Sequence, residues 1–461
     1  QVLLGELQLR SGDDATALQT LGTAERMAPS ARSEVLLAMG YQHLKQYDQA
    51  GHYLNLAKHR APNNPDVERS LAGYYRQMGQ YSDAIQELKA IPHPSPEIKA
   101  ELGYTYQLNG DLDEAAKVYT QAADAMPKNL ALQLSAAQAE VAAGSNDRAK
   151  NFLERVAHAE PDNYRLHAIR AQIDQIEDHP EDAIKEYTSA LAHLPATPAE
   201  GPLYSIQMQM DLVSLYRGLD QNDAAQKQLT LAENAIGTLD EQGADRAAFL
   251  RLRAKIRLSA GDVNAARTDI QSALALNPND PNNLQLSGDV LMKVGQPEEA
   301  IAAYKKVLAQ NPTNRSALTS LGYASRVVGR DKDAEMYFNR LAKADPHLYV
   351  PYLALGDLYS SRHDYSKAEN DYRKAFALSP RNASVIAGGM NAGIEAHKLE
   401  VAGAWMKRAT PAMQNNARLL REEERYLSFK GNYQESARLG EKAIQLLPKD
   451  RDVVVYLGYD Y

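Results

Sequence analysis

A period of 34 residues runs along this chain, and it constrains the fold more than any other feature of the sequence. Prolines mark it in two runs, Pro127, Pro161 and Pro195 and then Pro278, Pro312, Pro346 and Pro380. A fixed period of roughly 20 to 50 residues is typical of repeat proteins. In such proteins each unit packs on its neighbours in the chain, so the structure of one unit largely determines the fold.

Small residues keep the same period. One position is Ala in twelve of thirteen units and Ser in the last: Ala17, Ala50, Ala84, Ala115, Ala149, Ala183, Ala225, Ala266, Ala300, Ala334, Ala368, Ala402 and Ser436. A turn position lies five residues before it and is Gly in eight units: Gly12, Lys45, Gly79, Gly110, Gly144, Asp178, Asp220, Gly261, Gly295, Gly329, His363, His397 and Gly431. A second small position lies seven residues earlier again: Gly5, Ala38, Ala72, Gly103, Ala137, Ala171, Val213, Ala254, Gly288, Gly322, Gly356, Met390, Glu424 and Gly458.

These spacings predict two amphipathic helices per unit, joined at the turn position, where glycine ends the first helix in a left-handed conformation. The small positions face each other where the helices cross, so that the two backbones approach closely. Proline with Asn or Asp then ends the second helix, and Asp280 and Pro281 are the expected N-cap and first residue of the next one. The pattern predicts an all-α solenoid of about thirteen helix–turn–helix units.

This repeat resembles the tetratricopeptide repeat (TPR), a 34-residue helix–turn–helix with small residues at fixed places and Pro near its end. The resemblance covers the whole chain, and an aromatic residue typical of the first helix is present as Tyr41, Tyr75, Tyr106, Tyr216 and Tyr359. The early Trp of the consensus is missing, and Trp405, in a second helix, is predicted to be a core residue. The resemblance implies a right-handed superhelical array of a long bacterial type.

The period slips on both sides of Ala225, where the steps are 42 and 41 residues long. We therefore expect an N-terminal array over 1–194 and an irregular unit over 195–249, with lengthened helices and a Pro-rich loop. A C-terminal array would cover 250–461 and end in a truncated helix, because Gly458 repeats the second small position. Each array would hold about six units. The irregular unit is either a hinge or docking ridge, or a tolerated insertion.

Composition and motifs favour a binding protein over an enzyme. The net charge of −8 argues against a general nucleic-acid binder, and the absence of cysteine excludes disulfides and thiolate sites. No apolar run is long enough to suggest a membrane span. No phosphate-binding loop, zinc-protease helix or nucleophile elbow occurs, and the histidines are scattered. The sequence therefore predicts no catalytic residue, no cofactor and no metal site.

The resemblance implies that partners bind a concave groove lined by the first helices. Positions two, five, nine and twelve of the units would face this groove. Together with the stripe that Arg418 forms with its neighbours, they give the candidate binding residues Arg69, Arg76, Tyr104, Gln107, Arg217, Arg251, Gln285, Tyr323, Arg326, Arg418, Arg421 and Arg425. Arginine suits carboxylates, phosphates or stacked rings. The alternative is that these arginines pair with acidic residues of neighbouring helices. The Lys/Asn set by which some TPR domains clamp a chaperone's terminal carboxylate is missing, since Asn391 stands without partners.

Three functions are compatible with the sequence. The first is a non-catalytic scaffold that binds a protein or peptide in the groove. The second is a periplasmic scaffold of a bacterial envelope or exopolysaccharide-export machinery, because the architecture is similar to the TPR part of a bacterial cellulose synthase complex. The third is a regulatory array of an enzyme whose catalytic domain lies outside residues 1–461. The sequence does not fix the cellular location, although a periplasmic one is slightly favoured over a cytoplasmic one.

Overall fold

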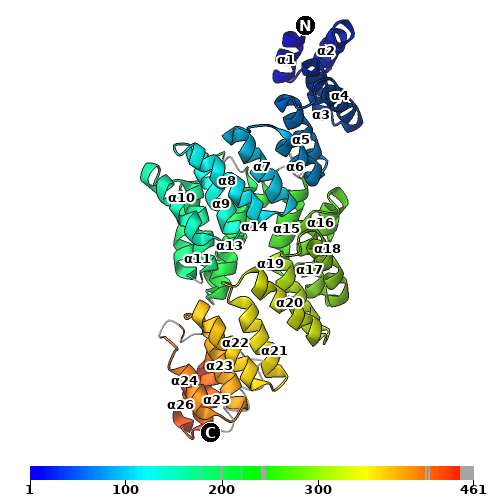
Figure 1. Cartoon of the computed structure of the whole chain (residues 1–461). Coiled ribbons are helices and arrows are strands. Elements are labelled where there is room, and N and C mark those ends of the chain that lie inside the picture. Colours follow the sequence, from blue (N-terminus) through cyan, green and yellow to red (C-terminus); the bar gives the residue numbers. More distant parts are fainter. Residues whose placement is uncertain are drawn as a thin grey trace. The chain divides into compact units, whose positions relative to one another are not determined.

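The computed structural model describes residues 1–177, 179–197, 201–219, 221–239, 246–410, 413 and 416–446. These residues form 26 α-helices and no strand (Figure 1). The chain divides into two compact units, Gln1–Pro161 and Asp162–Tyr461. None of the described helices has both the length and the apolar stretch needed to cross a membrane.

The first unit contains ten helices. They are α1 (Val2–Arg10), α2 (Asp14–Met27), α3 (Ala31–His43), α4 (Tyr47–Arg60), α5 (Pro65–Gln77), α6 (Tyr81–Ala90), α7 (Pro96–Asn109), α8 (Leu112–Ala125), α9 (Leu130–Ala142) and α10 (Asn146–Ala159).

The described part of the second unit contains sixteen helices. They are α11 (Tyr164–Ile176), α12 (Pro180–Ala192), α13 (Leu203–Gly218), α14 (Asn222–Gly237), α15 (Arg246–Ala260), α16 (Val263–Leu276), α17 (Pro281–Val294), α18 (Pro297–Gln310), α19 (Arg315–Val327), α20 (Asp331–Ala344), α21 (Val350–Ser361), α22 (Tyr365–Leu378), α23 (Ala383–Glu395), α24 (Leu399–Met406), α25 (Ala417–Phe429) and α26 (Tyr433–Leu446).

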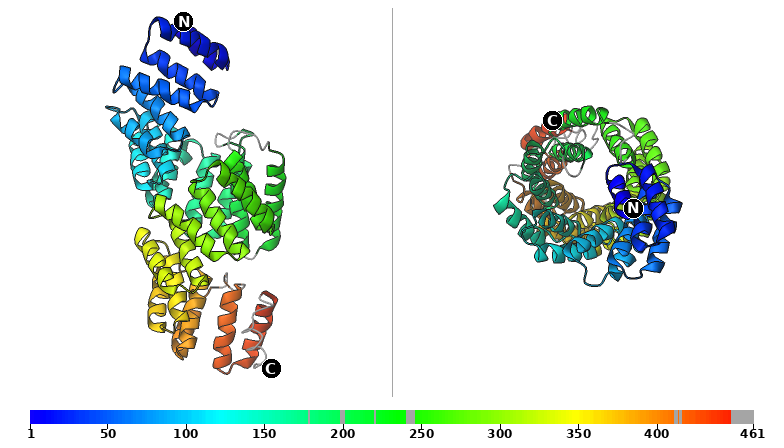
Figure 2. Two further views of the ribbon diagram at one scale, coloured as in Figure 1. Left: turned by 90° about the vertical axis from the view of Figure 1, so that its right-hand side faces the viewer. Right: turned by 90° about the horizontal axis from the view of Figure 1, so that it is seen from above.

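Within each unit, successive helices pack as antiparallel hairpins, and each hairpin packs on the next (Figure 2). Odd-numbered helices are the first helices of the repeats, and even-numbered helices are the second. The predicted all-α solenoid is therefore confirmed. The three-part division at 194 and 249 stays a prediction.

The turn positions explain why each hairpin turns where it does. Of the thirteen predicted positions, Asp178 and Asp220 lie outside the described residues, and the other eleven all have positive φ. Eight of these are glycine, and the exceptions Lys45, His363 and His397 have φ of 58°, 61° and 56°. The spacing of the repeat thus predicts a left-handed residue even where the side chain makes that conformation costly.

The helix crossings agree with the sequence as well. All thirteen small residues of the second helices, from Ala17 to Ser436, are at most 1% exposed. At the N-terminal ends, Asp280 caps α17 by accepting from the Asn283 amide, and Pro281 is the first helical residue. Trp405 is 2% exposed and belongs to the core of α22 to α25, as expected.

The irregular region has helices that are only slightly longer than the rest. Helices α13 and α14 have 16 residues each, whereas α17 and α18 have 14. The sequence predicts about one extra turn in each helix, which is more than this difference. The remaining extra residues fall between helices, in 193–202 and 238–245, of which the structure describes only part. Gly458 and the expected fourteenth first helix lie outside the described residues.

Candidate functional site

Four of the predicted groove arginines meet in one open cavity of the second unit. The cavity has a volume of about 620 Å³ and is lined chiefly by the first helices α19, α21, α23 and α25. We call it the arginine pocket. Its lining residues are Arg326, Asp357, Ser360, Ser361, His363, Tyr365, Tyr372, Asn391, Glu395, Arg418, Arg421 and Arg425.

Helix α25 supplies three of the arginines because of its sequence pattern. Arg418, Arg421 and Arg425 are three and four residues apart, so they share one face of the helix. Leu419 and Leu420, on the other side, are each 1% exposed and belong to the core. The helix begins where Asn416 accepts a hydrogen bond of 3.0 Å from the Leu419 amide. Burial of the apolar face thus fixes the direction of the arginine face.

Arg418 is held by an acidic residue that is 61 positions away in the chain. Its Nη2 donates to Asp357 Oδ1 at 2.7 Å, and the buried hydroxyl of Tyr372 donates to the same oxygen at 2.8 Å. Burial opposes the charged form of Arg418, but the adjacent Asp357 carboxylate outweighs it, so the pKa of Arg418 is raised. For Tyr372, burial raises the pKa, so its hydroxyl stays protonated and acts as a donor.

Arg421 and Arg425 share the carboxylate of Glu422, which is fully buried. The Nη2 of Arg421 donates to Glu422 Oε1 at 2.8 Å, and the Nη1 of Arg425 donates to Glu422 Oε2 at 2.7 Å. Arg425 also donates to Asn391 Oδ1 at 2.8 Å and to Glu395. Its side chain is only 8% exposed. These two arginines are therefore built into the wall of the pocket.

Arg326 differs from the other three arginines. It projects from α19 and is half-buried, and its guanidinium makes no hydrogen bond or ion pair with the described residues. Among the described residues, the carboxylates bound to the pocket arginines are those of Asp357, Glu395 and Glu422, and none of the three is bound to Arg326. The alternative that the groove arginines pair with acidic residues of neighbouring helices describes Arg418 and Arg425, which bind Asp357 of α21 and Glu395 of α23. Arg421 binds Glu422 of its own helix, and Arg326 binds no carboxylate of the described residues.

The other predicted residues of the second unit lie outside this pocket. Arg217 donates to the carbonyl of Ser259 at 2.9 Å. Arg251 donates to Asn283 Oδ1 at 3.2 Å, and the amide of Gln285 donates to Ser320 at 2.9 Å. Tyr323, next to Arg326 on α19, is 40% exposed and packs edge-on against the Phe338 ring.

The remaining candidates belong to the first unit. Arg69 donates from Nε to Glu101 Oε1 at 2.7 Å, and Arg76 donates to the Thr105 hydroxyl at 3.3 Å. Tyr104 on α7 is 51% exposed, and Gln107 lies one turn further along the same helix. Within the second unit, four of the predicted residues line one cavity, and the others of that unit have partners of their own.

The acidic and amide residues of the pocket are absent from the residues predicted from sequence. Asp357 and Ser360 occupy positions nine and twelve of their 34-residue repeat. Tyr323 and Arg326, which are among the predicted residues, occupy the same two positions of the preceding repeat. Reading the groove positions for all polar residues, instead of arginines and aromatics first, would have found them. Asn391, which the sequence places as the one asparagine suited to a chaperone-type clamp, lines the pocket and accepts from Arg425.

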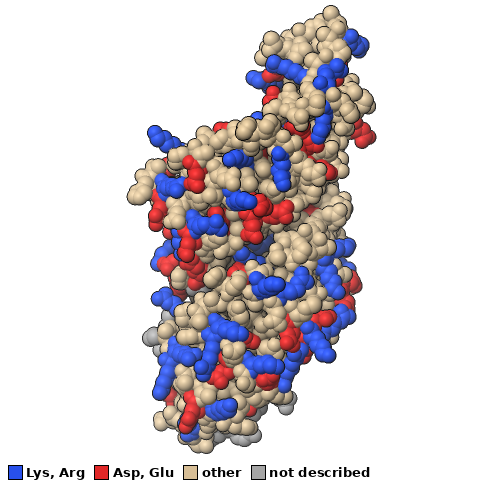
Figure 3. All heavy atoms as spheres, in the orientation of Figure 1, with Lys and Arg blue, Asp and Glu red and all other residues tan. Residues whose placement is uncertain are grey.

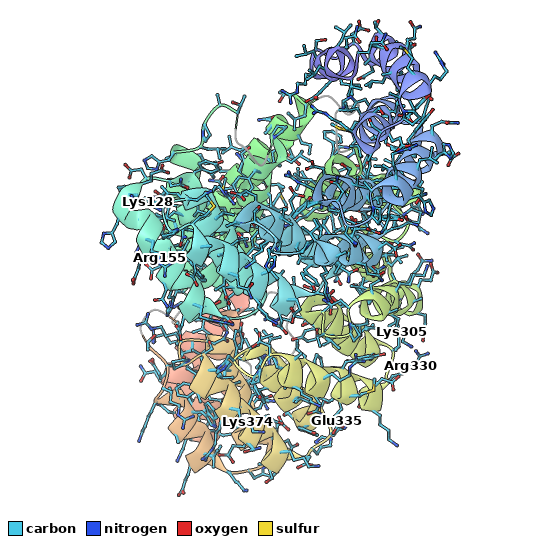
Figure 4. All side chains as sticks on the ribbon, turned by 45° about the horizontal axis from the view of Figure 1, so that its top comes forward. Lys128, Arg155, Lys305, Arg330, Glu335 and Lys374 are labelled. Atoms are coloured by element: carbon cyan, nitrogen blue, oxygen red, sulfur yellow. The ribbon has the colours of Figure 1, made fainter. Side chains whose placement is uncertain are left out.

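Other polar sites compete less well for a ligand. A cavity of about 600 Å³ is lined by Arg330, Glu335 and Arg362, the first two of which are labelled in Figure 4. There Arg330 pairs with Glu298 at 2.8 Å and Arg362 pairs with Glu335 at 2.6 Å. On the face drawn in Figure 3, cations and carboxylates are interspersed, without a large area of one sign.

One set of side chains in the second unit has the composition of a metal site. Asp162, His167 and His193 can each offer one ligand atom, and these atoms lie within 4.8 Å of one another. No other such group occurs among the described residues.

Comparison with known proteins agrees with the repeat. Models of the tetratricopeptide repeat match residues 107–173, 286–348 and 351–382. Cellulose synthase operon protein C of Pseudomonas fluorescens (strain SBW25) is 22% identical over 95% of this chain and 36% of its own length. Cellulose synthase 1 operon protein C of Komagataeibacter xylinus is 25% identical over 75% of this chain and 29% of its own. The chain therefore spans only about a third of these relatives.

Among solved structures, the crystal structure of the APC/C hetero-tetramer Cut9–Hcn1 matches with a TM-score of 0.55. The match covers 99% of this chain and 95% of that one, at 14% identity. At this identity the similarity concerns the fold alone.

Proposed function

We propose that this chain, which belongs to the tetratricopeptide-repeat superfamily, is a non-catalytic scaffold that binds an acidic peptide segment of a partner protein in the arginine pocket. Repeats of this kind imply a protein-interaction scaffold, because stacked units present an extended surface. The chemistry of the pocket favours an acidic ligand that binds at α19, α21, α23 and α25.

The guanidinium of Arg326 carries the proposal. A half-buried guanidinium that lacks a partner in the described part of the chain is incompletely compensated, and a carboxylate from outside would pair with it through two hydrogen bonds. Acidic residues already bind Arg418, Arg421 and Arg425. These three arginines therefore form the wall of the pocket and make it more positive, and Arg326 is the one that offers its donors to a ligand. A neutral glucan offers no charge to Arg326, and an acidic peptide does.

The test is to titrate a labelled Glu-rich peptide with the chain and to measure binding by fluorescence anisotropy. We expect the wild-type chain to bind it, and we expect the Gln-rich peptide of equal length to bind much more weakly. The variant Arg326→Gln should weaken binding about ten- to a hundredfold, the effect of losing a hydrogen-bonded charge. Affinity should also fall as salt rises, because the interaction is electrostatic.

Arg330→Gln is the matched control. Arg330 lies just beyond α19, carries the same charge and is paired with Glu298 outside the arginine pocket. It should leave the affinity unchanged. Equal losses in both variants would mean that the peptide responds only to the overall charge of the chain, and the proposed site would be wrong.

A second candidate concerns the system in which the scaffold acts. The alignment with proteins named cellulose synthase operon protein C, over 95% and 75% of this chain, favours a periplasmic role in an exopolysaccharide secretion system. In this case the acidic peptide would belong to another protein of the secretion machinery. Recovery of the protein only in the cytoplasmic fraction of its own cells would exclude this role.

A further inference from the structure

The hairpin α11–α12 brings together three side chains that metals commonly bind. Asp162 lies in the loop before α11, His167 lies in the second turn of α11, and His193 caps the C-terminal end of α12. One ligand atom from each lies within 4.8 Å of the others. The His193 Nε2 is 4.0 Å from Asp162 Oδ1, and the two imidazole rings stack at 5.9 Å.

Both imidazoles are held in the tautomer that a metal requires. The Nδ1 of His167 lies 2.6 Å from Glu186 Oε2, and the Nδ1 of His193 lies 2.9 Å from the carbonyl of Ser189. Each of these partners is an oxygen acceptor, so each Nδ1 must carry the proton and donate it. The lone pair of each ring is then on Nε2. Metal-binding histidines show the same arrangement, with the second nitrogen donating to a carboxylate or a backbone carbonyl.

The Nε2 of His167 is a buried nitrogen that a metal ion could bind. Its side chain is only 13% exposed, and the atom is buried without any hydrogen-bond partner among the described residues. A buried polar atom without a partner costs free energy, and a ligand can remove that cost. A metal ion is such a ligand, because the neighbouring groups are a second imidazole and a carboxylate.

We propose that Asp162, His167 and His193 bind one Zn²⁺ ion. Two imidazole nitrogens and one carboxylate oxygen form a ligand set that zinc accepts, and a fourth position would stay open to water or to a side chain of a partner. Glu186 and the carbonyl of Ser189 act as positioning groups, because they fix the two rings without touching the ion. The site departs from the expectation, drawn from the sequence, that the chain has no metal ligands.

Only a small movement closes the site. Zinc–nitrogen bonds of about 2.0–2.1 Å place tetrahedral ligand atoms closer together than 4.8 Å. The side chain of Asp162 is 77% exposed, so it can rotate toward the two imidazoles without disturbing the core. Such an ion would tie the start of α11 to the end of α12.

The experiment is calorimetric titration of the chelator-treated chain with Zn²⁺ alone, repeated with Co²⁺ to record its visible absorption. We expect one ion per chain and a Co²⁺ spectrum of low coordination number. His193→Ala and Asp162→Ala should each weaken binding at least about tenfold, since even the loss of a group that only orients a metal-binding side chain has this effect. Both residues are largely exposed, so these variants keep the fold even if His167→Ala does not.

His347→Ala is the matched control, because His347 is exposed and its ring has no described partner. It should bind the ion like the wild-type chain. Zinc should also raise the thermal midpoint of the wild type and of His347→Ala, but not that of His193→Ala, because only a folded site gains stability from its ligand. Absence of one-to-one binding, or equal affinity in all variants, would overturn the proposal.

Discussion

At the scale of single residues, the repeat depends on close approach between a glycine of the first helix and an aromatic ring of the second. A Cβ added to Gly322 would lie 2.2 Å from Phe338 Cε1, and one added to Gly288 would lie 2.3 Å from Tyr304 Cε1. Both rings are at most 1% exposed. The second small position is therefore a packing requirement, because the ring occupies the space that a side chain would need.

This packing predicts opposite effects for two Gly→Ala substitutions. Gly322→Ala should lower the free energy of unfolding by about 1–3 kcal/mol, because the fully buried Phe338 ring has no room to move. Gly73→Ala in α5 meets only the tip of Arg76 at 3.9 Å, and should raise stability by up to about 1 kcal/mol through helix propensity. Urea unfolding followed by circular dichroism measures both. Equal stability of the two variants would show that the Phe338 ring does not prevent a side chain at position 322.

At the scale of helices, ionisable groups connect neighbouring hairpins as well as pairing on the surface. Glu68 of α5 has a side chain that is 2% exposed, and its Oε2 makes no hydrogen bond with the described residues. Burial and the neighbouring Glu87 raise the pKa of Glu68 from 4.5 to about 7, while Lys58 opposes the shift. Lys58 donates to Glu87 Oε1 at 2.6 Å and is 3.6 Å from Glu68, so the two glutamates compete for one cation.

The raised pKa predicts how pH acts on this part of the first unit. Between pH 4.5 and about 7 the folded state holds a proton on Glu68 that the unfolded state has lost. The stability due to Glu68 is therefore fully present below pH 4.5 and is lost as pH rises through about 7. The variant Glu68→Gln should not show this loss. Hydrogen exchange of the α5 and α6 amides, corrected for intrinsic rates, measures it, and a difference from wild type that is independent of pH would contradict the assignment.

The helices and turns could be predicted because each depends on a few residues close in sequence. A left-handed residue at the turn and a small residue five positions later recur along the described repeats, so even Lys45 and His397 could be placed. The face that lines the groove follows from the same register. The helices and turns could therefore be predicted from the 34-residue period alone.

The candidate sites were harder to predict, because each depends on contacts between residues that lie far apart in the sequence. Arg418 of α25 meets Asp357 of α21 across 61 residues, a contact that depends on how the hairpins from α21 to α26 stack. Sequence spacing identified the arginine stripe, but could not decide which of the four pocket arginines would lack a partner among the described residues. The Asp162, His167 and His193 set was missed for a similar reason, since its ligands come from a loop, a helix and a helix cap without a recognisable motif.

At the scale of the whole molecule, the chain consists of two compact units of stacked hairpins, and the arginine pocket belongs entirely to the second. The sequence alone suggested a groove of polar residues from Arg69 to Arg425. Most of these arginines have internal partners, whereas the Arg326 guanidinium has none among the residues that the structure describes. Binding specificity is thus expected to reside in a few helices of the array.

Hydrogen–deuterium exchange of the chain, with and without saturating Glu-rich peptide, tests this localisation most directly. Bound peptide should slow exchange in α19, α21, α23 and α25, leave α5 and α7 of the first unit unchanged, and lose this effect in Arg326→Gln. Protection that spreads over both units, or that persists in Arg326→Gln, would contradict a binding site centred on the arginine pocket.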